Sequence, residues 1–318
     1  MKIAVVRLLL AVLVAGGVSA QEIAVIVKTG NSSFWQNVQG GAMDAQKELK
    51  KSTPKLSVTF LGPQSDAMIA EQINMVESAI DRGAKAIVLA PSDVTALLPA
   101  VKAAKVGGIP VIIFDSRLTG DTSNYVSFLA TDNVGAGVAC AKDMLARLKA
   151  KGITSGKLAI ESWAAGQGSE IDRVGGFKDF ITKNSKFTFV ATQYCNSDQV
   201  TALNQVTNTL AANPDVVGFF GANEPAAVGM GRAIAQAGLS GKLVAVGFDG
   251  NGVMQGFIKD GTLSSMCVQS SYKMGYLGVK YAYDVAIGKK KIDTLIDTGF
   301  IMVDKDNIDS KEAKAVLY

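Results

Sequence analysis

The sequence contains no histidine among its 318 residues. Histidine is the usual general base of serine and cysteine hydrolases, and its imidazole is the commonest protein ligand for transition metals. The absence therefore excludes the Ser-His-Asp and Cys-His classes of enzyme and any imidazole-based metal site. We predict no cofactor and no metal.

Cysteine is scarce as well, with single residues at Cys140, Cys195 and Cys267. An odd number excludes a complete set of internal disulfides, and such wide spacing does not resemble the framework of a disulfide-stapled domain. We interpret all three as small residues in or near the core. The sequence leaves open a bridge between two of them.

Long hydrophobic runs are missing beyond the first twenty residues. Residues 1–20 begin with two basic residues, continue with an apolar run from 8 to 14 and end in small residues. This order is typical of a secretory signal peptide, and the apolar run is shorter than the about 20 residues that a membrane-spanning helix needs. We predict export to the periplasm with cleavage after Ala20; a retained N-terminal anchor is the alternative.

A strong charge of either sign is lacking too. Lys2 and Arg7 lie in the predicted signal peptide, so the rest of the chain carries 30 basic residues against 28 acidic ones. The longest basic run, Lys289 to Lys291, is explained by a solvated turn. Binding to nucleic acid requires many phosphates to be neutralised, so we expect no nucleic-acid partner.

Motifs of nucleotide-binding and hydrolytic enzymes are absent. Residues 152–157 have the wrong spacing for a phosphate-binding loop, residues 250–252 form an isolated glycine turn, and no Gly-x-Ser-x-Gly elbow occurs. One enzymatic alternative survives, a secreted glycosidase with Asp115 and Asp249 as acid and base. It is disfavoured because Arg117 stands close to Asp115 in the sequence and favours the ionised carboxylate over the acid.

The sequence does contain a regular alternation of strand-like and helix-like segments. Residues 23–27 are continuously apolar, as in a parallel strand covered on both faces, and an amphipathic helix ending near Leu49 follows. The loop between them carries Phe34 and Trp35 at the carboxyl edge of the sheet, where open α/β folds bind their ligands. We therefore expect these two rings at the mouth of a site.

This unit of strand, loop and helix repeats along the chain. In the first half, Asp66 is expected to begin a helix. Two α/β units of similar size follow one another without a disordered linker, which predicts two doubly wound parallel-sheet lobes. The remaining strands are expected at 56–61, 86–90, 111–114 and 125–130 in the first unit, and at 157–161, 187–192, 216–220, 243–248 and 263–268 in the second.

The two units also match at the ends of their strands. One strand of the first unit ends in Phe114-Asp115, and the corresponding strand of the second ends in Phe248-Asp249. If the two sheets face each other, these carboxylates approach one cavity from opposite sides. Each Asp taken alone has a simpler explanation as a helix N-cap.

Polar and aromatic residues at these edges match a polyhydroxylated ring. The C–H faces of a sugar lie flat on aromatic rings, and its hydroxyls donate to carboxylates and accept from amides or guanidinium groups. Simpler alternatives exist here too: burial of the aromatic pair, a turn at Asn223, and an exposed helical position for Arg173 beside Asp172 or Glu170. The candidate sugar contacts are Phe34, Trp35, Asp115, Arg173, Asn223, Asp249 and Gln269.

The order of these motifs resembles the periplasmic sugar-binding proteins of the ribose-binding type, the substrate-capturing subunits of ATP-driven sugar importers. The resemblance covers essentially the whole chain after residue 20. It rests on Thr29-Gly30-Asn31-Ser32-Ser33-Phe34-Trp35, Val111 to Asp115, Ala130-Thr131-Asp132-Asn133, Arg173-Val174-Gly175-Gly176-Phe177, Ala222-Asn223-Glu224, Val246-Gly247-Phe248-Asp249-Gly250 and the strand end at Gln269.

The resemblance implies a type I periplasmic binding protein fold, in which two lobes joined by a three-segment hinge close around a ligand. The chain would cross between the lobes near Thr131, Gln269 and Phe300. The implied N-terminal lobe comprises residues 21–131 and 270–299, and the implied C-terminal lobe comprises residues 132–269 and 300–318.

Carried over position by position, the sugar contacts of the family fall on Ser32, Phe34, Trp35, Asp115, Thr131, Arg173, Asn223, Asp249 and Gln269. The sequence departs from the ribose-binding pattern at neighbouring candidate positions. Ser116 replaces an Arg expected directly after the first Asp of the cleft, and Arg117 stands one place later. Ser197 replaces an aromatic residue, and Trp35 is bulkier than the usual Phe. Another pentose, a hexose or a sugar alcohol therefore fits as well as ribose.

The resemblance also implies partners. We expect a non-enzymatic monomer that binds a small sugar or polyol and docks on the membrane permease of an ABC transporter; a chemoreceptor is a further candidate partner. A repressor of the lactose-repressor type shares this architecture, but a signal peptide stands where its helix-turn-helix would be. Capture of a sugar-like signalling molecule is another alternative.

Overall fold

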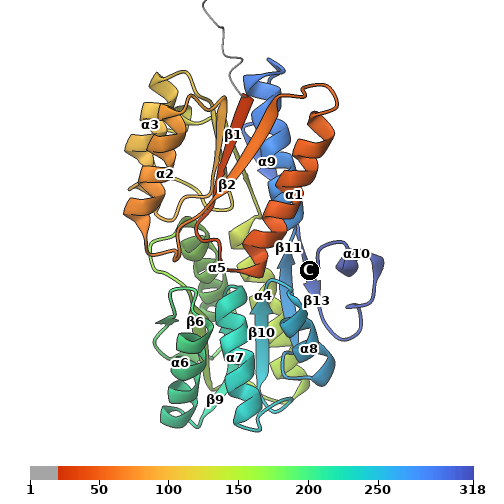
Figure 1. Cartoon of the computed structure of the whole chain (residues 1–318). Coiled ribbons are helices and arrows are strands. Elements are labelled where there is room, and N and C mark those ends of the chain that lie inside the picture. Colours follow the sequence, from red (N-terminus) through yellow and green to blue (C-terminus); the bar gives the residue numbers. More distant parts are fainter. Residues whose placement is uncertain (1–20) are drawn as a thin grey trace, which may run out of the picture.

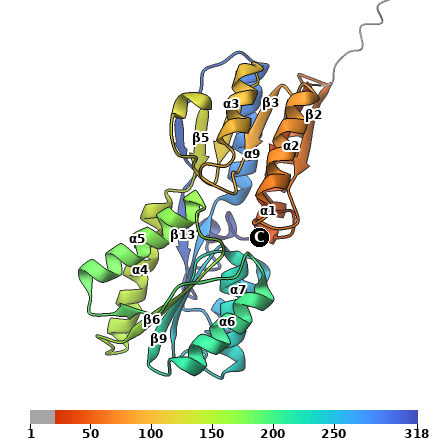
Figure 2. The same ribbon diagram turned by 90° about the vertical axis from the view of Figure 1, so that its left-hand side faces the viewer.

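The computed structural model describes residues 21–318 and places them in two α/β lobes, which lie one above the other in Figures 1 and 2. The predicted signal peptide, its cleavage after Ala20 and the alternative of an N-terminal anchor lie outside the described residues. No helix within residues 21–318 combines the length and the apolarity needed to cross a membrane.

The first lobe is built on a parallel sheet with the strand order β12-β5-β4-β3-β1-β2. Two pairs of helices cover its two faces, α1 with α9 and α2 with α3. The strands are β1 (Gln21–Ile26), β2 (Leu56–Leu61), β3 (Ala86–Leu89), β4 (Val111–Phe114), β5 (Ser127–Ala130) and β12 (Leu295–Asp297). The helices are α1 (Ser33–Leu49), α2 (Ile69–Asp81), α3 (Leu98–Val106), the short η1 (Thr122–Asn124) and α9 (Ser271–Ala286).

The second lobe repeats the plan with the order β13-β11-β10-β9-β6-β7, and β8 also pairs with β6. Helices α4 and α5 cover one face, and α6, α7 and α8 cover the other. The strands are β6 (Lys157–Ser162), β7 (Thr188–Phe189), β8 (Gln193–Tyr194), β9 (Val216–Gly221), β10 (Val244–Phe248), β11 (Ser265–Gln269) and β13 (Phe300–Val303). The helices are α4 (Asn133–Ala150), α5 (Gly168–Asn184), α6 (Gln199–Ala212), α7 (Glu224–Gln236), α8 (Gly252–Asp260) and α10 (Lys311–Lys314).

Burial on both faces explains the continuous apolar runs of the central strands. In β1 and just after it, Ile23, Val25 and Val27 pack in the core beneath α1 and α9, whereas Ala24 and Ile26 pack in the core beneath α2 and α3. Successive side chains of a strand point to opposite faces, so both sets must be apolar. Burying each large aliphatic side chain contributes about 1.5–3 kcal/mol.

The predicted fold class, two doubly wound parallel-sheet lobes, is confirmed. The structure differs from the sequence prediction in several segments. The strand expected at 187–192 is replaced by two short strands that pair with β6 at different points. Strands β12 and β13 were not predicted, because runs of three and four residues are too short to show a period. Helix α2 begins at Ile69 and not at Asp66.

The three cysteines are buried as free thiols. Cys140 and Cys267 lie in the core beneath α4 and α5, and Cys195 packs in a small cluster with Ala202 and Ala226. Their interpretation as core residues is confirmed, and the bridge that the sequence left open is not formed.

The chain passes between the two sheets at three points. It leaves β5 at Ala130 for α4, leaves β11 at Gln269 for α9, and leaves β12 at Asp297 for β13. Strand β13 runs antiparallel to β11, with Gln269 opposite Phe300. The first-lobe sheet therefore contains strands from both ends of the chain.

Helices α1 and α9 approach each other through glycine. A Cβ atom at Gly41 would overlap the carbonyl oxygen of Tyr272, and one at Gly275 would overlap the carbonyl oxygen of Val38. Because these contacts involve backbone atoms, neither helix can give way without a shift of the whole pair. The packing of α1, and with it the position of its first turn, depends on these glycines.

We predict that Gly41→Ala destabilises the first lobe whereas Gly40→Ala on the same helix does not. The first change should lower the free energy of unfolding by about 1–3 kcal/mol through overpacking. Gly40 is exposed, and a Cβ atom added there would meet no neighbour within 4 Å, so its replacement should stabilise the helix by about 0.5–1 kcal/mol. Urea denaturation followed by circular dichroism measures both. Equal effects of the two changes would contradict the proposed close approach.

Candidate functional site

A cavity of about 500 Å³ lies between the lobes and is lined by both. It collects the loops that follow β1, β2 and β4 in the first lobe and β6, β8, β9 and β10 in the second. The predicted residues that line it are Ser32, Phe34, Trp35, Asp115, Arg173, Ser197, Asn223, Asp249 and Gln269. The predicted residues that do not line it are Ser116, Arg117 and Thr131.

The first turn of α1 supplies an aromatic wall. Ser32 caps this helix by accepting a hydrogen bond from the backbone N–H of Trp35 at 3.4 Å. The rings of Phe34 and Trp35 meet edge to face with centroids 4.8 Å apart, and Trp35 also meets Phe114 edge to face. Each ring is only 5% exposed, and both rings line the cavity. The two interpretations of this pair, burial and a position at the site, are therefore compatible.

A third aromatic residue, Trp163, lines the cavity from the other lobe. It lies in the loop after β6, and its indole N–H donates to Gln167 Oε1 at 2.6 Å. The sequence analysis did not identify it. Strand β6 holds the same place in its sheet as β1 does in the first lobe, so the loops after the two strands are equivalent. A comparison of these two loops in the sequence could have identified Trp163.

Asp115 and Asp249 occupy equivalent strand ends, and both have a left-handed backbone, with φ of 60° and 77°. A non-glycine residue in this region costs on the order of 1 kcal/mol or more and is typical of functional sites. The N-cap alternative does not hold, because Asn251 caps α8 and no α-helix directly follows Asp115. Asp249 instead accepts from the backbone N–H of Glu224 at 3.0 Å and from Gln269 Nε2 at 2.9 Å.

Arg173 is fully buried, so the alternative interpretation of this residue as an exposed helix position is wrong. The guanidinium stacks on the ring of Phe248, 3.6 Å from its centroid. It donates to Asn133 Oδ1 at 2.7 Å and to the carbonyl of Ala222 at 2.7 Å. These contacts fix a cation in the wall of the cavity. Burial raises the pKa of Asp249 to about 6, and the charge of Arg173 acts against that rise.

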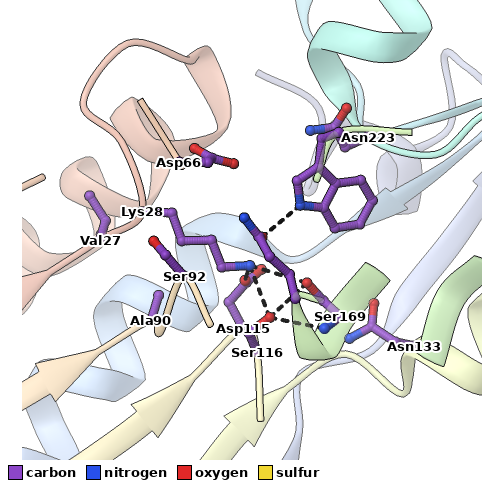
Figure 3. A network of polar contacts seen from close by, with 12 residues as sticks. Val27, Lys28, Asp66, Ala90, Ser92, Asp115, Ser116, Asn133, Ser169 and Asn223 are labelled. Atoms are coloured by element: carbon purple, nitrogen blue, oxygen red, sulfur yellow. Dashed lines mark hydrogen bonds and ion pairs between the residues drawn. The ribbon is translucent and has the colours of Figure 1, made fainter. Parts of the chain in front are cut away.

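Lys28 is the cation of the first lobe, and sequence reasoning missed it. Its ammonium lies 2.7 Å from Asp115 Oδ2 and donates to Ser116 Oγ at 2.9 Å and to Ser169 Oγ at 3.1 Å. Figure 3 shows the four side chains converging. Ser116, where the ribose-binding pattern has an Arg, thus binds Lys28 behind the cavity. A charged residue directly after the buried run 23–27 was the available signal.

Asp66 is the second residue with an unforeseen role. It does not cap α2; it is buried, and its Oδ2 accepts from Ser197 Oγ of the other lobe at 2.9 Å. Burial raises its pKa. Within residues 21–318, Asp66 Oδ1 and Gln269 Oε1 are buried without a hydrogen-bond partner, and both residues line the cavity. These two oxygens are acceptors without a partner in the wall of the cavity.

Asn223 serves two purposes. Its Oδ1 caps α7 by accepting from Ala226 N at 3.1 Å, and its Nδ2 donates to Ser197 Oγ at 3.4 Å while the residue lines the cavity. Asn223 therefore has a structural role at the start of α7 and also lines the cavity, so the two interpretations do not exclude each other.

Arg117 and Thr131 lie near the crossings between the lobes. Arg117 forms an ion pair with Asp172 of the other lobe at 2.8 Å, and Thr131 Oγ1 donates to the carbonyl of Gly299 at 3.5 Å. Both line a separate cavity of about 220 Å³ beside Asp297. Arg117 therefore pairs with Asp172, and the cation that pairs with Asp115 is Lys28.

We predict that Lys28→Met destabilises the protein and that Lys28→Met combined with Asp115→Asn recovers most of the loss. The single change leaves a buried carboxylate without its cation, which costs about 3–5 kcal/mol. The double change removes both charges. Urea denaturation measures both variants, and equal destabilisation by the single and the double variant would show that the pair does not stabilise the first lobe.

Comparison with known proteins finds similar chains over most of the described residues. A profile described as "Periplasmic binding protein domain" matches residues 23–290. The D-allose-binding periplasmic protein of Escherichia coli (strain K12) is 30% identical over 280 residues, covering 86% of this chain and 87% of that protein. The ribose import binding protein RbsB of the same strain is 32% identical over 276 residues, covering 87% of this chain and 88% of the relative.

Two solved structures extend the similarity to the whole fold. A solute binding protein of an ABC transporter from Agrobacterium vitis, with bound D-fucose, is 54% identical with a TM-score of 0.89 and covers 93% of this chain and 100% of its own. A carbohydrate transporter solute binding protein from Agrobacterium radiobacter, in complex with D-arabinose, is 34% identical with a TM-score of 0.89 and covers 95% of this chain and 100% of its own.

Proposed function

This chain belongs to the family of periplasmic binding proteins, and on that premise we propose that it captures one monosaccharide between its lobes and delivers it to the membrane permease of an ABC importer. The family consists of sugar-binding transport proteins, so the glycosidase and repressor alternatives are set aside. The supporting observation is the cavity between the lobes, which brings an acid from each half together with aromatic rings.

The proposed ligand contacts follow from the chemistry of the lining. Ring hydroxyls donate to Asp115, Asp249, Asp66 Oδ1 and Gln269 Oε1, and accept from Arg173 and Asn223. The C–H faces lie against Phe34, Trp35 and Trp163. The lining is rich in acceptors, which favours an uncharged polyol over a sugar acid or a sugar phosphate.

A pentose or a 6-deoxyhexose is the proposed ligand class. D-fucose and D-arabinose are bound by the two structurally similar proteins, and neither sugar carries a hydroxyl on a sixth carbon. Such a ligand presents one apolar end, which suits the aromatic wall of Phe34 and Trp35.

The proposed lobes are residues 21–131 with 270–299, and residues 132–269 with 300–318, hinged at the three crossings. Contacts between them support a closed arrangement around a ligand: the Arg117–Asp172 ion pair, and hydrogen bonds from Ser197 to Asp66 and from Ser116 to Ser169.

We further propose export to the periplasm with cleavage after Ala20, a monomeric state, and a chemoreceptor as a second docking partner.

The proposal predicts that D-fucose or D-arabinose raises the thermal unfolding temperature of the purified protein. A ligand at a hundredfold excess over its dissociation constant stabilises by about 2.7 kcal/mol. A screen of pentoses, hexoses, 6-deoxyhexoses and polyols measures the shift, and Asp249→Asn should abolish it while leaving the unliganded protein folded. Recovery of unchanged sugar after long incubation is expected, and hydrolysis of a matching glycoside would contradict the binding function.

The affinity should depend on pH through Asp249. Hydroxyl donors favour its carboxylate, so binding lowers a pKa that lies at about 6 in the free protein. Affinity should be constant above pH 6 and should fall by up to about tenfold per pH unit below it. Burial raises the pKa of the neighbouring Glu224 to about 7, so the titration is repeated with Glu224→Gln. Calorimetry measures the profile; a flat profile in both proteins would rule out Asp249 as a ligand acceptor.

A further inference from the structure

Glu224 reaches from one lobe to the other. It is the first residue of α7, in the second lobe, and is 1% exposed beside the cavity. Its Oε1 accepts a hydrogen bond at 3.2 Å from the backbone N–H of Ser33, the first residue of α1 in the first lobe. The carboxylate therefore lies at the N-terminus of a helix that belongs to the opposite half of the molecule.

This position satisfies an electrostatic need of α1. The first N–H groups of a helix have no partner within the helix and create a positive potential that favours an anion. Helix α1 has no acidic residue in its own first turn, and Glu224 supplies an acceptor oxygen to that turn from across the cleft. That same turn carries Phe34 and Trp35, which form the aromatic wall of the cavity.

Tyr318 fixes the other oxygen of Glu224. Its hydroxyl donates to Glu224 Oε2 at 3.0 Å, and its ring packs against the core beneath α1 and α9 of the first lobe. Its backbone is tied to the second lobe, where its N–H donates to the carbonyl of Gly250 and its carbonyl accepts from Gln255 Nε2. Tyr318 thus touches both lobes while it orients the carboxylate.

We propose that Glu224 and Tyr318 are positioning residues that fix the first turn of α1 when the lobes close, so that its aromatic wall meets the sugar. Tyr318 orients Glu224, and Glu224 holds the N–H of Ser33. The proposal rests on the proposed closure around a ligand. Because the contact joins two lobes, it forms on closure and should slow release of the sugar more than it speeds capture.

The decisive variants are Ser33→Pro and Ser33→Ala. Proline is favoured at the first position of a helix, and the extended backbone of Ser32 (φ −116°, ψ 152°) suits a residue before proline. It removes the N–H that Glu224 accepts and places its ring Cδ against Glu224 Oε1, so the contact between the lobes is lost while α1 is kept. Alanine removes the hydroxyl and keeps the N–H. The backbone N–H of Phe34, which also bonds to the Glu224 carboxyl group, remains in both variants. We therefore expect Ser33→Pro to weaken D-fucose binding by about threefold to tenfold relative to Ser33→Ala.

The dissociation rate should carry most of this change, measured by stopped-flow fluorescence of Trp35 and Trp163. Tyr318→Phe should also raise the dissociation rate, and it should add nothing further in the Ser33→Pro background because both act through one carboxylate. Equal affinity of Ser33→Pro and Ser33→Ala would overturn the proposal. If Tyr318→Phe raises the dissociation rate of the Ser33→Pro protein as much as that of the unchanged protein, the proposed role of Tyr318 is wrong.

A distance measurement between two spin labels tests the positioning role of Glu224 and Tyr318 without any ligand. Lys50→Cys and Lys259→Cys place labels on exposed positions of the two lobes, and the native cysteines are buried. In the unliganded protein, Ser33→Pro should shift the distance distribution towards the open state relative to Ser33→Ala. If no sugar binds, the proposed ligand fails while this comparison still decides the positioning role; identical distributions would then refute it.

Discussion

Each lobe places a buried cation near its own cleft carboxylate, and the meeting of the two acidic strand ends at one cavity depends on this. Asp115 lies 2.7 Å from the ammonium of Lys28, and Asp249 lies in the field of the buried Arg173. A buried carboxylate without compensation costs several kcal/mol, and two of them facing each other would add repulsion. With a cation in each half, the two acidic strand ends can approach one small ligand from opposite sides.

The repeat that places these acids extends to the packing of the helices. In the first lobe α1 meets α9 through Gly41 and Gly275, and in the second lobe α4 meets α5 through Gly137 and Gly176, each at backbone contact. Both cleft acids follow a Phe and adopt a left-handed backbone. The lobes differ at their edges, where β12 runs parallel to β5 while β13 runs antiparallel to β11.

The sequence predicted most of the fold because the relevant signals are local. Buried parallel strands show as apolar runs, and the carboxyl ends of such strands lie at the binding edge, which identified Phe34, Asp115 and Asp249. The roles of Lys28 and Asp66 could not be predicted in this way. Lys28 binds Ser169 from a distant part of the chain, and Asp66 binds Ser197 in the other lobe, so both depend on how the lobes meet.

The exchange of an expected Arg for Ser116 also changes what the cavity offers a ligand. The three donors of the Lys28 ammonium point to Asp115, Ser116 and Ser169, so this cation is occupied by the protein. An Arg in the ribose-binding pattern would bring five donors to the same end. In the proposed binding mode, the first lobe therefore recognises its ligand through acceptors and aromatic rings. A ligand in that mode brings its own hydroxyl donors to this end, which favours neutral sugars whose adjacent hydroxyls reach Asp115 and Asp66 together.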